Sequence, residues 1–123
     1  MTVKECYDAI NGDYAEAIGR FRSDSNIVKF IRLFMNDTSI DELKTAFYAQ
    51  DYEKAFRATH TLKGVLRNMA FNDFAQDVID ITEMLRGGKD IESAIAFFPT
   101  IVNKAHTTNE VLVRFLSERD LLA

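Results

Sequence analysis

The sequence predicts an all-α protein, a single antiparallel up-and-down four-helix bundle with short amino-terminal capping helices. Apolar residues recur at the i, i+3, i+4 spacing of amphipathic helices in nearly every segment, and no run alternates with the period of a strand. Only one proline and five glycines occur in 123 residues. The breaks between the long segments are short, which favours antiparallel neighbours. We expect one domain, with residues 1–22 as the cap and residues 23–123 as the bundle.

The first half of the chain carries several helix boundaries. Asn11-Gly12 favours a turn between two short helices. Ser23-Asp24-Ser25 then offers N-cap side chains for a longer, largely apolar helix. Ser39 and Glu42 have the spacing of a capping box, in which each side chain binds the other residue's free backbone N–H. That pair predicts a helix ending near Gln50.

A central helix is predicted from Tyr52 to about Ala70, with Asp51 as its cap. Its apolar positions advance in alternating steps of three and four, so they form one stripe along the helix. The stripe consists of Tyr52, Ala55, Thr59, Leu62, Leu66 and Met69. This face is expected to meet the core.

Two further helices complete the predicted bundle. One begins at Asn72 or Asp73 and ends at Gly87-Gly88, where glycine permits a left-handed cap. The last begins near Asp90. Pro99 lies inside it and cannot donate a backbone hydrogen bond, so a kink or a restart is expected there.

Composition excludes several classes of function. The formal net charge of -4 and a pI near 5.1 argue against a nucleic-acid partner. Cys6 is the single cysteine, which excludes an internal disulfide and suits a reducing compartment. Neither a signal-peptide core nor an apolar stretch of membrane-spanning length is present, so we expect a cytoplasmic protein. The two histidines and the cysteine do not have the spacing of a metal site, so none is predicted. The sequence also lacks a nucleotide-binding loop and a nucleophile motif, which argues against an autonomous kinase or hydrolase.

The most informative residue is His60. A rotation of about 100° per residue points His60 roughly 130° away from the centre of the apolar stripe, and therefore toward solvent. Phe56, Lys63, Gly64 and Arg67 lie on the same face. An exposed imidazole is a nucleophile at cellular pH, and a nearby lysine can pair with a phosphoryl group of charge about -2. Gly64 costs about 1 kcal/mol relative to alanine, but it leaves room for another protein's active site.

These residues alone leave two interpretations open, a phosphoacceptor or a docking face. Each feature taken singly also fits an ordinary surface, since exposed histidines and cations are common on helices. Gly64 could instead allow two helices to pack closely. The second histidine, His106, lies beside the apolar stripe of the last helix and is given no role.

The segment Ala58-Thr59-His60-Thr61-Leu62-Lys63-Gly64 resembles the signature of histidine-containing phosphotransfer (HPt) domains, which reads His, any residue, Leu, Lys, Gly. The chain from Asn26 to Gly88 is also similar to that family in the order of its helices. Further similarity lies in the lead-in Asp51 to Ala55 and in the helix end Met84-Leu85-Arg86.

The resemblance implies that His60 is the phosphorylated residue, that Lys63 supports the phosphohistidine and that Gly64 leaves room for a partner. The partners would be response-regulator receiver domains and a sensor or hybrid histidine kinase. In such phosphorelays the aspartyl phosphate and the Mg²⁺ ion belong to the receiver. The resemblance therefore implies a two-component signal transduction carrier that holds no cofactor and is not itself an enzyme.

Several positions depart from the family pattern. The family commonly has small residues after the Lys-Gly pair and a glycine near the helix end, whereas this chain has Val65, Arg67 and Ala70. Arg67 stands where smaller residues are common, and its long cation could contact the phosphoryl group or a partner, or obstruct docking. The family often orients its histidine with Gln or Glu on the following helix. The nearest match here is Thr82, with Glu83 beside it.

Two rival functions follow from the same bundle. It could dock a receiver as an adaptor without accepting phosphate. It could also be a structural bundle in which an outward Phe56 and an outward Phe71 form an oligomer contact. We expect a monomer.

Overall fold

The computed structural model describes residues 1–122, and its regular structure is helical throughout that range, so the predicted all-α fold is confirmed. The elements in chain order are α1 (Val3–Ala9), α2 (Tyr14–Phe21), α3 (Asp24–Met35), α4 (Ser39–Tyr48), α5 (Tyr52–Asn68), α6 (Asn72–Leu85), a 3₁₀ turn (Arg86–Gly88) and α7 (Ile91–Leu122). None of these helices is both long and apolar enough to span a lipid bilayer.

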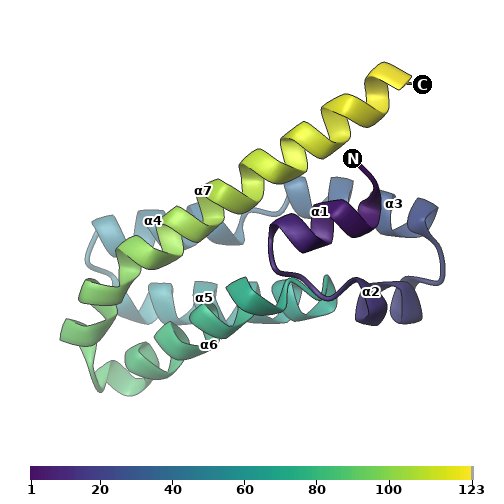
Figure 1. Cartoon of the computed structure of the whole chain (residues 1–123). Coiled ribbons are helices and arrows are strands. Elements are labelled where there is room, and N and C mark those ends of the chain that lie inside the picture. The colour runs from purple at the N-terminus through teal and green to yellow at the C-terminus, as the bar shows by residue number, and fades with distance from the viewer. Residues whose placement is uncertain (123) are drawn as a thin grey trace.

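The four-helix bundle consists of α4, α5, α6 and α7. Each helix packs against the one before it in the chain and runs in the opposite direction (Figure 1). Stacked side chains close the bundle between its first and last helices. The ring of Phe47 in α4 lies parallel to that of Phe98 in α7, with centroids 4.0 Å apart. The up-and-down order expected from the short connections is therefore present.

The helices α1, α2 and α3 lie together at one end of the bundle, and α1 packs against α7 (Figure 1). The cap therefore extends beyond the predicted residues 1–22, because α3, expected in the bundle, lies with α1 and α2. These three helices cover the turn between α5 and α6. The hydroxyl of Tyr7 donates to the carbonyl of Met69, and the backbone N–H of Asp13 donates to that of Ala70, both at 2.8 Å. A Cβ at Gly12 would lie 3.1 Å from that Ala70 oxygen and 2.8 Å from the Tyr7 ring. Glycine is therefore required for this close approach.

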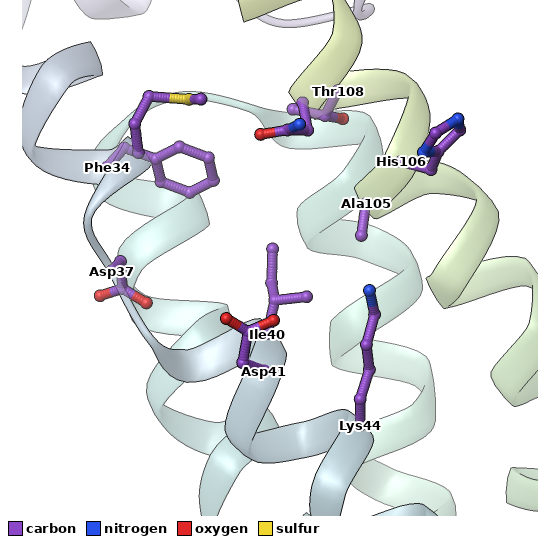
Figure 2. A pocket seen from close by; sticks show the side chains of 10 residues that line it. Phe34, Asp37, Ile40, Asp41, Lys44, Ala105, His106 and Thr108 are labelled. Atoms are coloured by element: carbon purple, nitrogen blue, oxygen red, sulfur yellow. The ribbon is translucent and has the colours of Figure 1, made fainter. Parts of the chain in front are cut away.

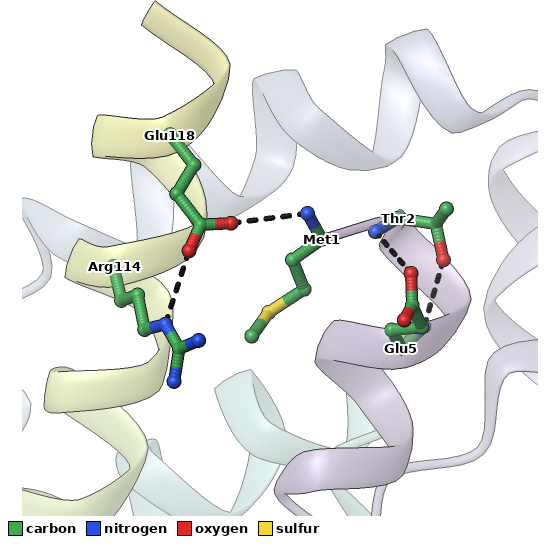
Figure 3. Close-up of polar contacts among 5 residues, drawn as sticks. All are labelled: Met1, Thr2, Glu5, Arg114 and Glu118. Atoms are coloured by element: carbon green, nitrogen blue, oxygen red, sulfur yellow. Dashed lines mark hydrogen bonds and ion pairs between the residues drawn. The ribbon is translucent and has the colours of Figure 1, made fainter. Parts of the chain in front are cut away.

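A small polar cluster ties the first residues to α7 (Figure 3). The amine of Met1 lies 3.0 Å from Oε2 of Glu118, and Oε1 of the same carboxylate accepts a hydrogen bond from Nε of Arg114. Thr2 and Glu5 form a capping box at the start of α1. The hydrogen bonds from Thr2 lower the pKa of the Glu5 carboxyl. These exposed contacts orient α1 on α7 and contribute little stability individually.

Most helix boundaries are set by the side chains that the sequence indicates. Ser23 caps α3, and Asp51 caps α5 through its contact with the N–H of Lys54. Gly87 and Gly88 both adopt positive φ, at 64° and 68°, just after α6. The predicted caps at these three places are confirmed.

The capping box predicted from Ser39 and Glu42 is wrong. Ser39 is the first residue inside α4, and its backbone N–H is bound by the carboxylate of Asp37 at 2.8 Å. Thr38 occupies the N-cap position without a capping bond of its own. Asp37 thus takes the N–H that the box assigns to the Glu42 carboxylate, and the N–H of Glu42 donates to the backbone carbonyl of Thr38 at 2.9 Å instead of to the Ser39 hydroxyl.

Of the two outcomes predicted at Pro99, a kink or a restart, the restart does not occur, because α7 continues through this residue without interruption. The missing N–H of Pro99 leaves the carbonyl of Ile95 without its helical donor. Both residues are exposed, so water can reach that carbonyl and replace the bond. The helix therefore tolerates the proline on its solvent side.

The predicted stripe of α5 forms part of the core, where Thr59, Leu62 and Leu66 are fully buried. Phe71, expected to face outward in the oligomer interpretation, is instead buried. Its ring lies 5.3 Å from that of Tyr7 in α1, and the ring of Phe34 in α3 is equally close. The capping helices cover it, so Phe71 offers no surface for an oligomer contact.

Candidate functional site

The imidazole of His60 lies on the outer face of α5. The neighbouring Thr59 and Leu62 are 0% exposed and point into the bundle, whereas His60 is exposed. Each residue advances the helix by about 100°, so His60 points away from the buried face that Thr59 and Leu62 share. The exposure predicted for His60 is confirmed.

No hydrogen bond within residues 1–122 involves the ring of His60. The hydroxyl of Thr59 donates to the carbonyl of Phe56, and that of Thr61 to the carbonyl of Arg57, both within α5. The hydroxyl of Thr82 is buried in α6 and donates to the carbonyl of Val78. Thr82 therefore makes no bond that would orient His60, and both ring nitrogens stay available.

An aromatic ring is the neighbour of the imidazole. The centroids of Phe56 and His60 lie 6.3 Å apart with their planes inclined by only 27°. The guanidinium of Arg86 lies over the Phe56 ring, 5.1 Å from its centroid. Glu83 holds that guanidinium through two hydrogen bonds, at 2.9 and 3.2 Å. A continuous series of contacts thus connects α6 to the face of His60.

Lys63, one turn after His60, is half-buried. The hydrogen bonds from Arg86 lower the pKa of the Glu83 carboxyl, and the charges of Lys63 and Lys89 lower it further. The ammonium of Lys63 therefore lies within electrostatic reach of Glu83. No carboxylate of the described residues is within ion-pair distance of it, so its charge stays available to an incoming anion.

Gly64 is exposed, and a Cβ built on it would meet no atom within 4 Å. The alternative explanation, that Gly64 allows two helices to pack closely, is wrong because no helix approaches it. The open space lies over α5 one turn beyond His60. Among the described residues, no contact requires a glycine there.

Arg67 is exposed two turns beyond His60, about 10 Å further along the helix axis. It borders a hollow between the capping helix α2 and α6, together with Arg20 and Gln76. Arg20 donates to the carbonyl of Arg67 at 3.2 Å, which ties the cap to the end of α5. His60, Lys63 and Gly64 therefore lie together, while Arg67 lies toward the cap.

His106 lies elsewhere, on the wall of a cleft of about 260 Å³ between α7 and the α3–α4 corner (Figure 2). Its Nε2 is 2.8 Å from Oε1 of Glu110. Asp37, Asp41 and Lys44 face the same cleft. No three His, Cys, Asp or Glu side chains in the described part of the chain gather closely enough to hold a metal ion.

The contacts of Arg86 with Phe56 and Glu83 were missed by the sequence analysis. Glu83 and Arg86 have the i, i+3 spacing of a helical ion pair, and that signal is present in the sequence. The contact with Phe56 joins two different helices, so only the tertiary packing reveals it.

One comparison with known proteins gives a match. A family model described as Hpt domain matches residues 33–109, which is more than half of the chain. No curated protein and no solved structure matches the sequence.

Proposed function

The chain belongs to the Hpt domain family, and from that premise we propose that His60 accepts a phosphoryl group from the aspartate of one receiver domain and donates it to another. Hpt domains are phosphocarrier modules of phosphorelays rather than catalysts. The proposal therefore makes this chain an intermediate carrier that depends on a receiver domain and on a sensor or hybrid histidine kinase. The cytoplasm is the proposed site of action, and the monomer the proposed form.

One observation carries the proposal, namely the exposed imidazole of His60 beside the open space over Gly64. Transfer requires the phosphorus of the partner to come within bonding distance of a ring nitrogen, so the partner's active site must approach the helix closely. The empty position one turn along provides that approach. An isolated helix gains nothing from glycine there.

In the accepting step, the lone pair of the unprotonated ring nitrogen of His60 attacks the phosphorus of an aspartyl phosphate. The N–P bond forms as the P–O bond to the aspartate breaks, and the carboxylate leaves with that electron pair. The other ring nitrogen keeps its proton. In the donating step a carboxylate of a second receiver attacks the same phosphorus, and the imidazole leaves as a neutral ring.

Lys63 would stabilise the adduct, because its ammonium lies one turn from the ring and can pair with a phosphoryl dianion. The Mg²⁺ ion that this chemistry uses is expected on the receiver, and we propose no cofactor for this chain. Arg67 and Thr82 lie outside the group formed by His60, Lys63 and Gly64. Arg67 is a candidate partner contact at the edge of the face, and Thr82 is already bonded within α6.

The direct test is transfer from receiver domains phosphorylated with radiolabelled acetyl phosphate. The native chain is expected to gain a label that is labile in acid and stable in alkali, and His60→Gln should abolish it. His106→Gln is the matched control, because it removes the other exposed histidine and should leave labelling unchanged. Binding of receivers without any labelling would contradict the proposal and favour the adaptor interpretation.

A further inference from the structure

The side chain that contacts the imidazole of His60 is Phe56, and this contact suggests how the nucleophile is oriented. We propose that Phe56 is the positioning residue for His60 and that Arg86, held by Glu83, keeps Phe56 in place. The inference rests on the proposed function, since it assigns a residue to the orientation that phosphoryl transfer requires. It gives to Phe56, through ring stacking, the orienting role for which Thr82 is the nearest match to the family pattern.

The geometry suits a positioning contact. Phe56 precedes His60 by four residues, so their side chains are neighbours on one face of α5. A centroid distance of 6.3 Å and an angle of 27° describe an offset, nearly parallel pair, within the range that aromatic rings prefer. This contact favours one plane for the imidazole ring among those that its side chain can adopt.

A stack has a chemical advantage over a hydrogen bond at this place. A side chain that bonds a ring nitrogen fixes the tautomer but occupies one of the two nitrogens. Phe56 has no hydrogen-bonding atom in its side chain, and no hydrogen bond of the described residues reaches His60. The imidazole is therefore oriented while both nitrogens remain free for phosphorus and for solvent.

Phe56 is itself held from the side of α6. Its ring is half-buried against the core, and the Arg86 guanidinium lies 5.1 Å from its centroid, within the range of a cation–π contact. Arg86 is fixed in turn because Glu83 binds Nε and a terminal nitrogen together, which defines the plane of the guanidinium. Phe56 therefore provides a more rigid wall than an exposed aromatic ring would.

The size of the effect follows from the conformations that the stack excludes. A helical histidine has about two accessible χ1 wells and about two ring orientations, so an unrestrained ring occupies about four states. Phe56→Leu, which keeps an apolar side chain but removes the ring, should lower kcat for transfer from saturating phosphorylated receiver about fourfold. KM should change little.

Kinetics distinguish positioning from docking. Phe56→Tyr keeps the ring and should restore kcat to the native value, whereas Phe56→Leu should not. A rise in KM with unchanged kcat would make Phe56 a docking contact and overturn the proposal. Thermal unfolding of both variants checks that each remains folded at the assay temperature.

An NMR measurement on the free, unphosphorylated chain tests the proposal independently of phosphotransfer. Three-bond couplings across Cα–Cβ of His60 should report one dominant χ1 state in the native chain and averaging in Phe56→Leu. The couplings of His106 serve as the internal reference and should not change. Arg86→Gln should give intermediate averaging at His60. Unchanged His60 couplings in Phe56→Leu would overturn the positioning role of Phe56, even if the native chain transfers phosphate. If the couplings change as expected but the native chain is never labelled by phosphorylated receivers, only the proposed function is contradicted.

Discussion

The two histidines of this chain are both exposed on helices, yet their surroundings differ at the same relative position. The residue four places after His60 is Gly64, which leaves open space. The residue four places after His106 is Glu110, whose carboxylate lies 2.8 Å from the ring. A phosphoryl donor can therefore approach His60 through open space, whereas at His106 it is repelled by the negative charge of Glu110. Exposure alone therefore does not define a phosphoacceptor, and the i+4 neighbour distinguishes the two.

The largest effect is expected when His60 is given the environment of His106. Gly64→Glu places a carboxylate beside the ring, and a charge of -1 repels a phosphoryl group of -2 by about 1.7 kcal/mol at about 5 Å in water. Transfer should fall by more than about tenfold, measured as the initial rate of label transfer from a phosphorylated receiver. The helix should become more stable by about 1 kcal/mol, because glycine is removed from its interior.

Two control variants separate charge from bulk at this position. Gly64→Ala should stabilise α5 similarly and slow transfer least, because its single methyl group enters open space. Gly64→Gln has the length of glutamate without its charge and should lie between the two. If both Gly64→Gln and Gly64→Glu transfer phosphate at the native rate, the open space over Gly64 is not needed for the approach of a partner.

A smaller loss is expected when the cation beside His60 is removed. Lys63→Ala should slow phosphohistidine formation or shorten its lifetime about tenfold, which corresponds to about 1.4 kcal/mol and to the lower end of the contribution of a hydrogen bond to a charged group. The decay of purified labelled chain measures this lifetime. Lys44→Ala is the matched control, because Lys44 faces the cleft of His106 instead. A large drop in melting temperature for Lys63→Ala would show that the lysine acts mainly in folding.

The smallest effect is expected when His106 is given the environment of His60. Glu110→Gly removes the carboxylate, but it supplies neither a cation three residues on, where Asn109 stands, nor an aromatic ring four residues before, where Val102 stands. His106 should therefore remain unlabelled, which His60→Gln/Glu110→Gly tests without background from His60. Strong labelling of this double variant would mean that an open i+4 position is sufficient for transfer.

Local sequence signals predicted much of this molecule. The stripe of α5 and the caps at Ser23 and Asp51 depend on residues a few positions apart, so periodicity and spacing reveal them. The exposure of His60 follows from the same periodicity. Its nearness to Lys63 and Gly64 follows as well, because all three lie on one helix.

The wrong predictions involve competition or contacts between distant segments. Asp37 takes the N–H of Ser39 that was assigned to Glu42, although both carboxylates could accept it. Phe71 is buried because α1 and α3 cover it, and that packing is not visible in its immediate sequence. The stack of Phe56 on His60 joins two residues of one helix, but Arg86 reaches it from another.

The most direct test of the account locates the phosphoryl group on the chain. The ring nitrogens of both histidines can be observed together by NMR in isotope-labelled chain while phosphorylated receiver is added. The account predicts that one ring nitrogen of His60 shifts and gains a coupling to phosphorus while the His106 signals stay in place. A phosphorus coupling at His106, or unchanged signals from both rings while the receiver loses its phosphate to the chain, would contradict it.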